Sequence, residues 1–143
     1  MSAALRSSLR IHRRQLAAVL QALDYQPDED FSLAHNVCDC LSDYHWYAAA
    51  PQDEWLSFEF ASDDDEQMDW EVLLTLTPFL EEGSYYEERA GDYVLDAQGQ
   101  QRTGLIRAWV EQGQLKGMIY ALVPDPTGSA VREPVAPLDP RMI

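Results

Sequence analysis

A change in the spacing of apolar residues near position 50 constrains the fold of this chain more than any other feature. Before it, apolar side chains recur every three or four residues, as on one face of a helix. After it, they recur at every second residue, as on one face of a strand. Residues 3–23 carry such a helical stripe, from Leu5 through Leu9 to Leu23, and predict a first helix.

A second helix is predicted to begin at Pro27 and to end before Pro51. Proline suits the first helical position, and the acidic residues 28–30 in the first turn suit the helix dipole. The buried face would consist of Leu33, Val37, Cys40, Leu41, Tyr44 and Tyr47. Two helices joined by a short turn predict an antiparallel pair.

The second half of the chain predicts strands and turns. Alternation predicts a strand over 55–61, and over 68–77 it favours a strand, although apolar residues at 68, 72, 73, 76 and 80 also fit a helix. Further strands are expected at 85–89, 92–95, 103–110 and 115–123, the last two joined as a hairpin around Gly113. Residues 124–143 contain four prolines beyond Pro124 and predict an extended, weakly self-supporting tail.

These elements predict an α+β fold. Two N-terminal antiparallel helices would pack on one face of a four- or five-stranded antiparallel β-meander, followed by an extended Pro-rich C-terminal tail. Residues 1–123 would form a single domain and residues 124–143 the tail. The other face of the sheet would be exposed to solvent or would bind a partner.

The charge of the chain is strongly negative and unevenly distributed. The net charge is −15, and residues 53–92 hold fourteen acidic side chains but one basic side chain, Arg89. Residues 1–23 carry four arginines and no acid. Such a charge argues against binding nucleic acid or an anionic membrane and favours a basic protein partner.

The sequence holds no catalytic motif, so we predict a protein that is not an enzyme and has no catalytic, cofactor-binding or metal-binding residues. Two free thiols, Cys38 and Cys40, fit a cytoplasmic location better than an oxidising compartment, although the arginine-containing N-terminus also has features of a mitochondrial transit peptide. The acidic run 63–66 lacks the glycine of a calcium loop. His35, Cys38, Cys40 and His45 diverge on a helix and do not suit one zinc ion.

The acidic and aromatic residues of 53–92 instead predict a partner-facing rim. Tryptophan and tyrosine are enriched among binding hot spots, and carboxylates around them would select a cationic partner. The predicted partner-binding residues are Trp55, Glu59, Asp63, Asp64, Asp65, Glu66, Asp69, Glu71, Tyr85, Tyr86, Glu87 and Glu88.

In size, acidity and these acidic–aromatic residues, the chain resembles the small acidic immunity proteins that neutralise bacterial toxins. The resemblance implies a stoichiometric inhibitor that occludes a basic site on a toxin or effector, such as a nuclease. The alternatives are a cytoplasmic adaptor or secretion chaperone, which could be a homodimer, and a metal-dependent hydrolase that uses the acidic run 63–66.

Overall fold

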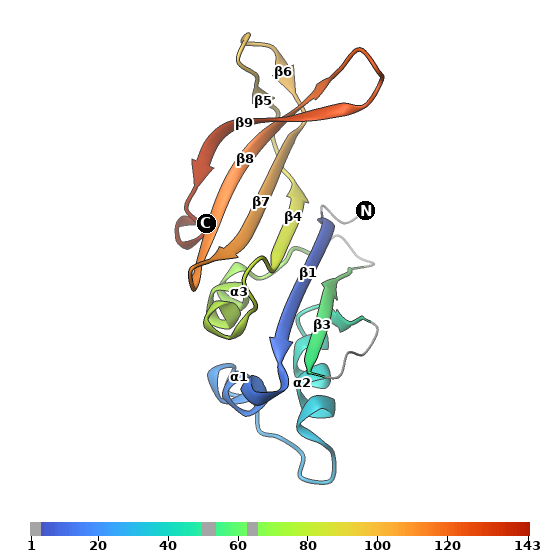
Figure 1. Cartoon of the computed structure of the whole chain (residues 1–143), viewed down its shortest axis with the longest axis vertical. Helices are drawn as coiled ribbons and strands as arrows, with labels where there is room; N and C mark the ends of the chain where they lie inside the picture. The colour runs from blue at the N-terminus through green and yellow to red at the C-terminus, as the bar shows by residue number, and fades with distance from the viewer. Residues whose placement is uncertain (1–3, 50–53, 63–65) are drawn as a thin grey trace.

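The fold is built on one seven-stranded antiparallel sheet, seen in a computed structural model that describes residues 4–49, 54–62 and 66–143 (Figure 1). The order across the sheet is β2-β3-β1-β4-β7-β8-β9, and β5 and β6 form a separate two-stranded sheet. The strands are β1 (Ala4–His12), β2 (Trp46–Ala48), β3 (Trp55–Phe60), β4 (Tyr85–Arg89), β5 (Val94–Leu95), β6 (Gln101–Arg102), β7 (Gly104–Glu111), β8 (Gln114–Pro124) and β9 (Ala130–Leu138).

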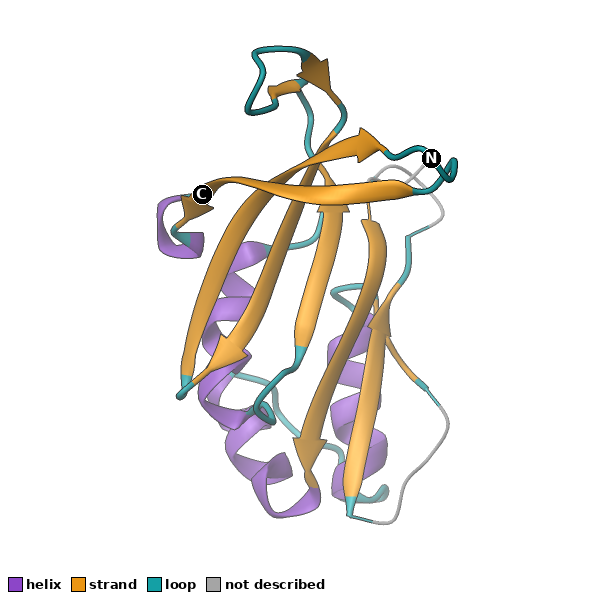
Figure 2. Cartoon of the chain, turned by 45° about the horizontal axis from the view of Figure 1, so that its top comes forward, coloured by secondary structure: helices purple, strands orange, loops and turns teal. Residues whose placement is uncertain are grey.

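Three short helices pack against one face of this sheet, as Figure 2 shows. They are α1 (Leu16–Ala22), α2 (Leu33–Ser42) and α3 (Trp70–Leu76). Single 3₁₀ turns lie at η1 (Arg13–Gln15), η2 (Thr77–Phe79) and η3 (Pro140–Met142). The core lies between the helices and the sheet, and its fully buried side chains include Leu9, Ile11, Val19, Val37, Leu41, Trp46, Phe58, Leu73, Leu76 and Tyr86.

The predicted N-terminal helix is wrong for its first half. Residues 4–12 form β1, which lies inside the sheet between β3 and β4, and only Leu16–Ala22 is α-helical. Leucines at 5 and 9 fit a helical stripe, but Leu9 and Ile11 also alternate with Ser8 and Arg10. Hydrogen bonds to β3 on one edge and to β4 on the other satisfy the backbone N–H and C=O groups of this segment. These long-range contacts outweigh the weak helical spacing of its apolar residues.

The second predicted helix is wrong at both ends. It begins at Leu33 rather than at Pro27, because the Ser32 hydroxyl accepts a hydrogen bond from the His35 backbone N–H (3.1 Å) and caps the helix. It ends at Ser42, and His45 then adopts a positive φ of 67° that turns the chain into β2. Of the predicted buried face, Val37, Cys40 and Leu41 are confirmed and Tyr44 is partly buried, whereas Leu33 and Tyr47 are exposed.

The favoured strand over 68–77 is also wrong, because this segment forms α3. Asp69 caps the helix by accepting hydrogen bonds from the backbone N–H groups of Glu71 (3.0 Å) and Val72 (3.3 Å). The apolar residues of the alternative helical pattern, Met68, Val72, Leu73, Leu76 and Leu80, are all buried.

The fold therefore has α+β character, but the predicted arrangement of a helical pair on a four- or five-stranded meander is wrong. The strands at 55–60 and 85–89 and the β7–β8 hairpin are confirmed, with Gln112 and Gly113 both at positive φ in its turn. The predicted extended tail contains β9, which pairs with β8 along most of its length and forms one edge of the sheet.

Candidate functional site: the helix-free face of the sheet

The face of the sheet opposite the helices carries a second set of side chains. Successive residues of a strand point to opposite faces, so the neighbours of core residues point away from the helices. In β1, Leu9 and Ile11 are core residues, which places Ser8, Arg10 and His12 on the other face. In the same way, the helix-free face receives Trp55, Ser57 and Glu59 from β3, Tyr85, Glu87 and Arg89 from β4, and Leu105, Arg107 and Trp109 from β7.

Glu87 lies at the centre of this face and is bound by arginines from three other strands. Its side chain has no exposed surface. Arg132 of β9 donates two hydrogen bonds to it, Nη1 to Oε1 at 2.6 Å and Nη2 to Oε2 at 3.1 Å. Arg107 of β7 donates a further hydrogen bond to Oε1, and the Nε of Arg6 in β1 lies 3.8 Å from Oε2.

We call Arg6, Arg107, Arg132 and Glu87 the arginine cluster. Two strands, β7 and β8, separate β9 from β4 in the sheet order, yet Arg132 reaches Glu87. Figure 2 shows why, since β9 crosses over the side of the sheet that the helices leave uncovered. The far end of the sheet therefore curls toward this face and brings the four side chains together.

The electrostatics of the arginine cluster favour a bound anion. Burial raises the pKa of Glu87, but hydrogen bonds and charge from Arg132 and Arg107 outweigh burial and hold that pKa below its usual value. The hydrogen bond to Glu87 raises the pKa of Arg132. Three guanidinium groups with one carboxylate leave a net charge of +2 at neutral pH.

Aromatic rings flank the arginine cluster. The Arg107 guanidinium lies 4.3 Å from the centre of the Tyr85 ring, a cation–π geometry. Toward the other end of β1, Arg10 lies 5.2 Å from the Trp55 ring and forms an ion pair with Glu81 at 2.6 Å. Two hollows of about 210 and 200 Å³ lie on either side of Tyr85, one lined by Arg6 and the other by Arg10.

The structure separates the residues of the predicted rim. Trp55, Glu59, Tyr85 and Glu87 lie on the helix-free face. Tyr86 is 1% exposed and packs in the core, and Glu88 points to the same side of β4. Asp69 and Glu71 belong to the start of α3, and Glu66 forms an ion pair with His45, while residues 63–65 lie outside the described part of the chain.

Sequence reasoning missed the arginine cluster. Arg6 was assigned to a helix, and Arg107 and Arg132 were single basic residues in separate segments. The positions are distant along the chain and share no spacing that marks a site. The one sequence signal was the alternation that places Tyr85, Glu87 and Arg89 on one side of a strand.

The other candidate sites have structural explanations. Within the described residues, no group of three or more His, Cys, Asp or Glu side chains is placed to hold a metal ion. Of the four zinc candidates, His35 pairs with Asp39 (3.2 Å) and Cys40 is buried in the core. Burial raises the pKa of the Cys40 thiol to about 11, with a further contribution from Asp43, which makes it a poor nucleophile or ligand.

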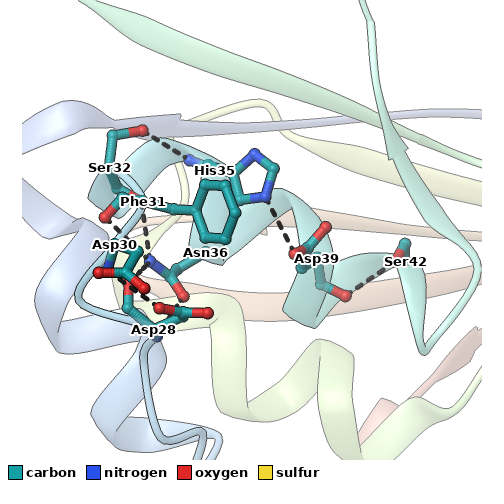
Figure 3. A network of polar contacts seen from close by, with 8 residues as sticks. All are labelled: Asp28, Asp30, Phe31, Ser32, His35, Asn36, Asp39 and Ser42. Carbon is teal, nitrogen blue, oxygen red and sulfur yellow. Dashed lines mark hydrogen bonds and ion pairs between the residues drawn. The ribbon is translucent and has the colours of Figure 1, made fainter.

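The polar network in Figure 3 holds the loop before α2. Asn36 is 2% exposed and lies at its centre. Its side-chain amide nitrogen donates to the carbonyls of Asp28 (3.0 Å), Phe31 (3.4 Å) and Ser32 (2.9 Å), and its oxygen accepts from the Asp28 N–H (2.7 Å). Every polar atom of this amide is used within the loop, so the network fixes the α1–α2 connection.

Comparison with known proteins does not assign this chain to a family. No family model matches it. No curated protein and no solved structure gives a significant match. None of the helices in the described segments has the length and apolar character that crossing a membrane requires.

Proposed function

We propose that this chain is a protein-binding module that uses the helix-free face of its sheet as the interface. The observation that carries the proposal is the arginine cluster with its neighbouring rings, Tyr85 and Trp55. Arginine, tyrosine and tryptophan are the residues most enriched among binding hot spots. Buried guanidinium–carboxylate pairs also hold side chains in fixed positions, which lowers the entropy cost of binding.

The charge distribution points to the character of the partner. The chain as a whole carries −15, which attracts a basic protein over long distances. The centre of the helix-free face is locally positive, which favours an acidic segment at close range. A partner that is basic overall and carries a local acidic segment satisfies both conditions.

A basic toxin or effector would be such a partner, and the chain would then act as a stoichiometric inhibitor. Composition and size support this part of the proposal, as do three predicted rim residues that lie on the proposed face with solvent-accessible side chains: Trp55, Glu59 and Tyr85. The adaptor, chaperone and hydrolase alternatives remain predictions.

The experiment compares two charge-reversal variants of the full chain in capture from extracts of the source cells. The face variant carries Arg6→Glu and Arg89→Glu. The matched control carries Arg14→Glu and Arg141→Glu, which change the net charge equally but lie in the 3₁₀ turns η1 and η3 and not in the strands that form this face. Captured proteins are identified, purified and titrated by calorimetry at low and high salt. A partner that binds the control but not the face variant supports the proposal, whereas equal binding to both variants refutes this interface.

A further inference from the structure

We infer that the arginine cluster binds a carboxylate of an Asp or Glu side chain presented by a partner peptide, with the Tyr85 ring as one wall of the site. This inference rests on the proposed function and deepens it, because it names the group that the interface recognises. It assigns the binding chemistry to Arg6, Arg107 and Arg132.

The arginines retain hydrogen-bonding capacity beyond Glu87. A guanidinium has five N–H donors, so the three side chains together have fifteen. Within the described residues, three of these donate hydrogen bonds to Glu87. The side chains of Arg6, Arg107 and Arg132 are 67%, 29% and 36% exposed, so solvent and ligands reach them.

Glu87 acts as an internal anion that positions the arginines. Its carboxylate holds Arg107 of the neighbouring strand β7 and Arg132 of β9, which the curl of the sheet brings close to β4, and the Arg107 guanidinium lies over the Tyr85 ring. A free arginine side chain loses much rotamer freedom when it binds an anion. Here that freedom is already lost in the folded protein, so an incoming carboxylate meets donors in place.

The surroundings favour an isolated carboxylate over a polyanion. Glu59 borders one hollow beside Tyr85, and Glu81 and Glu82 border the other. A nucleic acid would place successive phosphates against these carboxylates and against a chain of net charge −15. A peptide can place one carboxylate between the arginines and keep neutral residues over the acidic borders, and a planar carboxylate accepts paired hydrogen bonds from a guanidinium.

The test is an NMR titration of the full ¹⁵N-labelled chain in 150 mM salt. The probes are a capped hexapeptide with one glutamate among five glutamines (the glutamate peptide), a capped hexaglutamine peptide, inorganic phosphate and a single-stranded oligonucleotide. We expect saturable shifts of the Arg6, Arg107 and Arg132 side-chain Nε resonances with the glutamate peptide and none with hexaglutamine. The inference is overturned if the glutamate peptide causes no such shifts, or if phosphate or the oligonucleotide binds more tightly than the glutamate peptide.

Two variants connect the binding to the residues. Arg6 contributes a long ion pair and is exposed, so Arg6→Gln should leave the fold intact and weaken binding of the glutamate peptide about fivefold, the value of an ion pair of about 1 kcal/mol. Arg14→Gln is the matched control and should not change the affinity. Equal affinities for the two variants would overturn the inference.

The removal of the internal anion gives an opposite expectation. Glu87→Gln keeps one acceptor oxygen that can still position the arginines, and it raises the cluster charge from +2 to +3. It should therefore strengthen binding of the glutamate peptide if the variant folds, and weaker binding by a folded variant would count against the site. If Glu87→Gln does not fold, the Arg6 comparison decides. If the glutamate peptide does not bind while partner capture still depends on Arg6 and Arg89, the interface stands and the carboxylate recognition is refuted. If neither the peptide nor a partner binds in this way, the proposed function is refuted as well.

Discussion

Glu87→Gln provides the sharpest test of the energetics of the sheet. The carboxylate is fully buried and accepts three hydrogen bonds from two arginines, while a third arginine lies within ion-pair distance. Hydrogen bonds to charged groups contribute about 1.5–3 kcal/mol each, and breaking a buried pair by removing one partner costs about 3–5 kcal/mol. Because Arg107 and Arg132 are partly exposed and glutamine still offers one acceptor oxygen, we expect a loss of about 3 kcal/mol at pH 7.

The pH dependence of this loss identifies its cause. The arginines hold the pKa of Glu87 below its ordinary value of 4.5 in the folded state, despite burial. The stabilisation by Glu87 is therefore complete above the unfolded pKa and disappears as the pH falls through the lower, folded pKa. The difference between wild type and Glu87→Gln should be largest near neutral pH and should shrink steadily in acid below about pH 4.5.

Urea unfolding followed by tryptophan fluorescence, at a series of pH values from 7 to 3, measures this difference. Glu59→Gln is the matched control, because Glu59 lies on the same face in β3 but is exposed. We expect the control to differ from wild type by less than about 0.5 kcal/mol. A Glu87→Gln effect below about 1 kcal/mol at pH 7, or one that does not change with pH, would refute the reasoning.

Three further predictions concern other parts of the fold. Asn36→Ala removes the buried amide at the centre of the loop network together with its part-buried hydrogen bonds to the backbone, so the free energy of unfolding should fall by about 2–3 kcal/mol, whereas an unchanged value would show that water replaces the amide. Gly117→Ala would bring a Cβ within 2.7 Å of the Leu138 carbonyl oxygen, so we expect β9 to shift and stability to fall by about 1–3 kcal/mol in thermal unfolding; a more stable variant would contradict the close packing. Burial raises the pKa of the Cys40 thiol to about 11 and also raises that of Cys38, so iodoacetamide at pH 8 should modify the folded chain slowly. The half-buried Cys38 should react first, and rapid labelling of Cys40 would disprove its burial.

The elements that could be predicted were those in which local signals agree. The strand at 55–60 alternates from Leu56 to Phe60, and the β7–β8 hairpin has a glycine where the turn requires a positive φ. The helical residues 33–42 also show a clear buried stripe at Val37, Cys40 and Leu41. In each of these segments the apolar residues recur at one clear spacing, and the residue at the boundary suits the start or end of the predicted element.

The errors arose where two periods coexist in one segment. Residues 4–12 contain apolar residues at both spacings, and their pairing with β3 and β4 decides the outcome, which no local pattern shows. In the segment of α3, the alternation of Val72, Leu74 and Leu76 fits a strand, although the segment folds as a helix. The residue that favours the helix is Asp69, whose side chain accepts hydrogen bonds from backbone N–H groups of the first turn. The arginine cluster depends on the curl that brings β9 back to β4, so it could not be found before the sheet order was known.

The position of β1 in the middle of the sheet has a consequence for the order of folding. β1 alone joins the β2–β3 pair to the four strands β4, β7, β8 and β9. Ser7 pairs with Tyr86, and closing a loop of roughly eighty residues costs about 4 kcal/mol of chain entropy. During synthesis on the ribosome, β3 follows β1 before β4 does, so the edge of β1 that faces β4 stays unpaired until β4 has emerged. We expect slow, high-contact-order folding in which β1 docks late, so that the nascent chain depends on holdase chaperones during this interval.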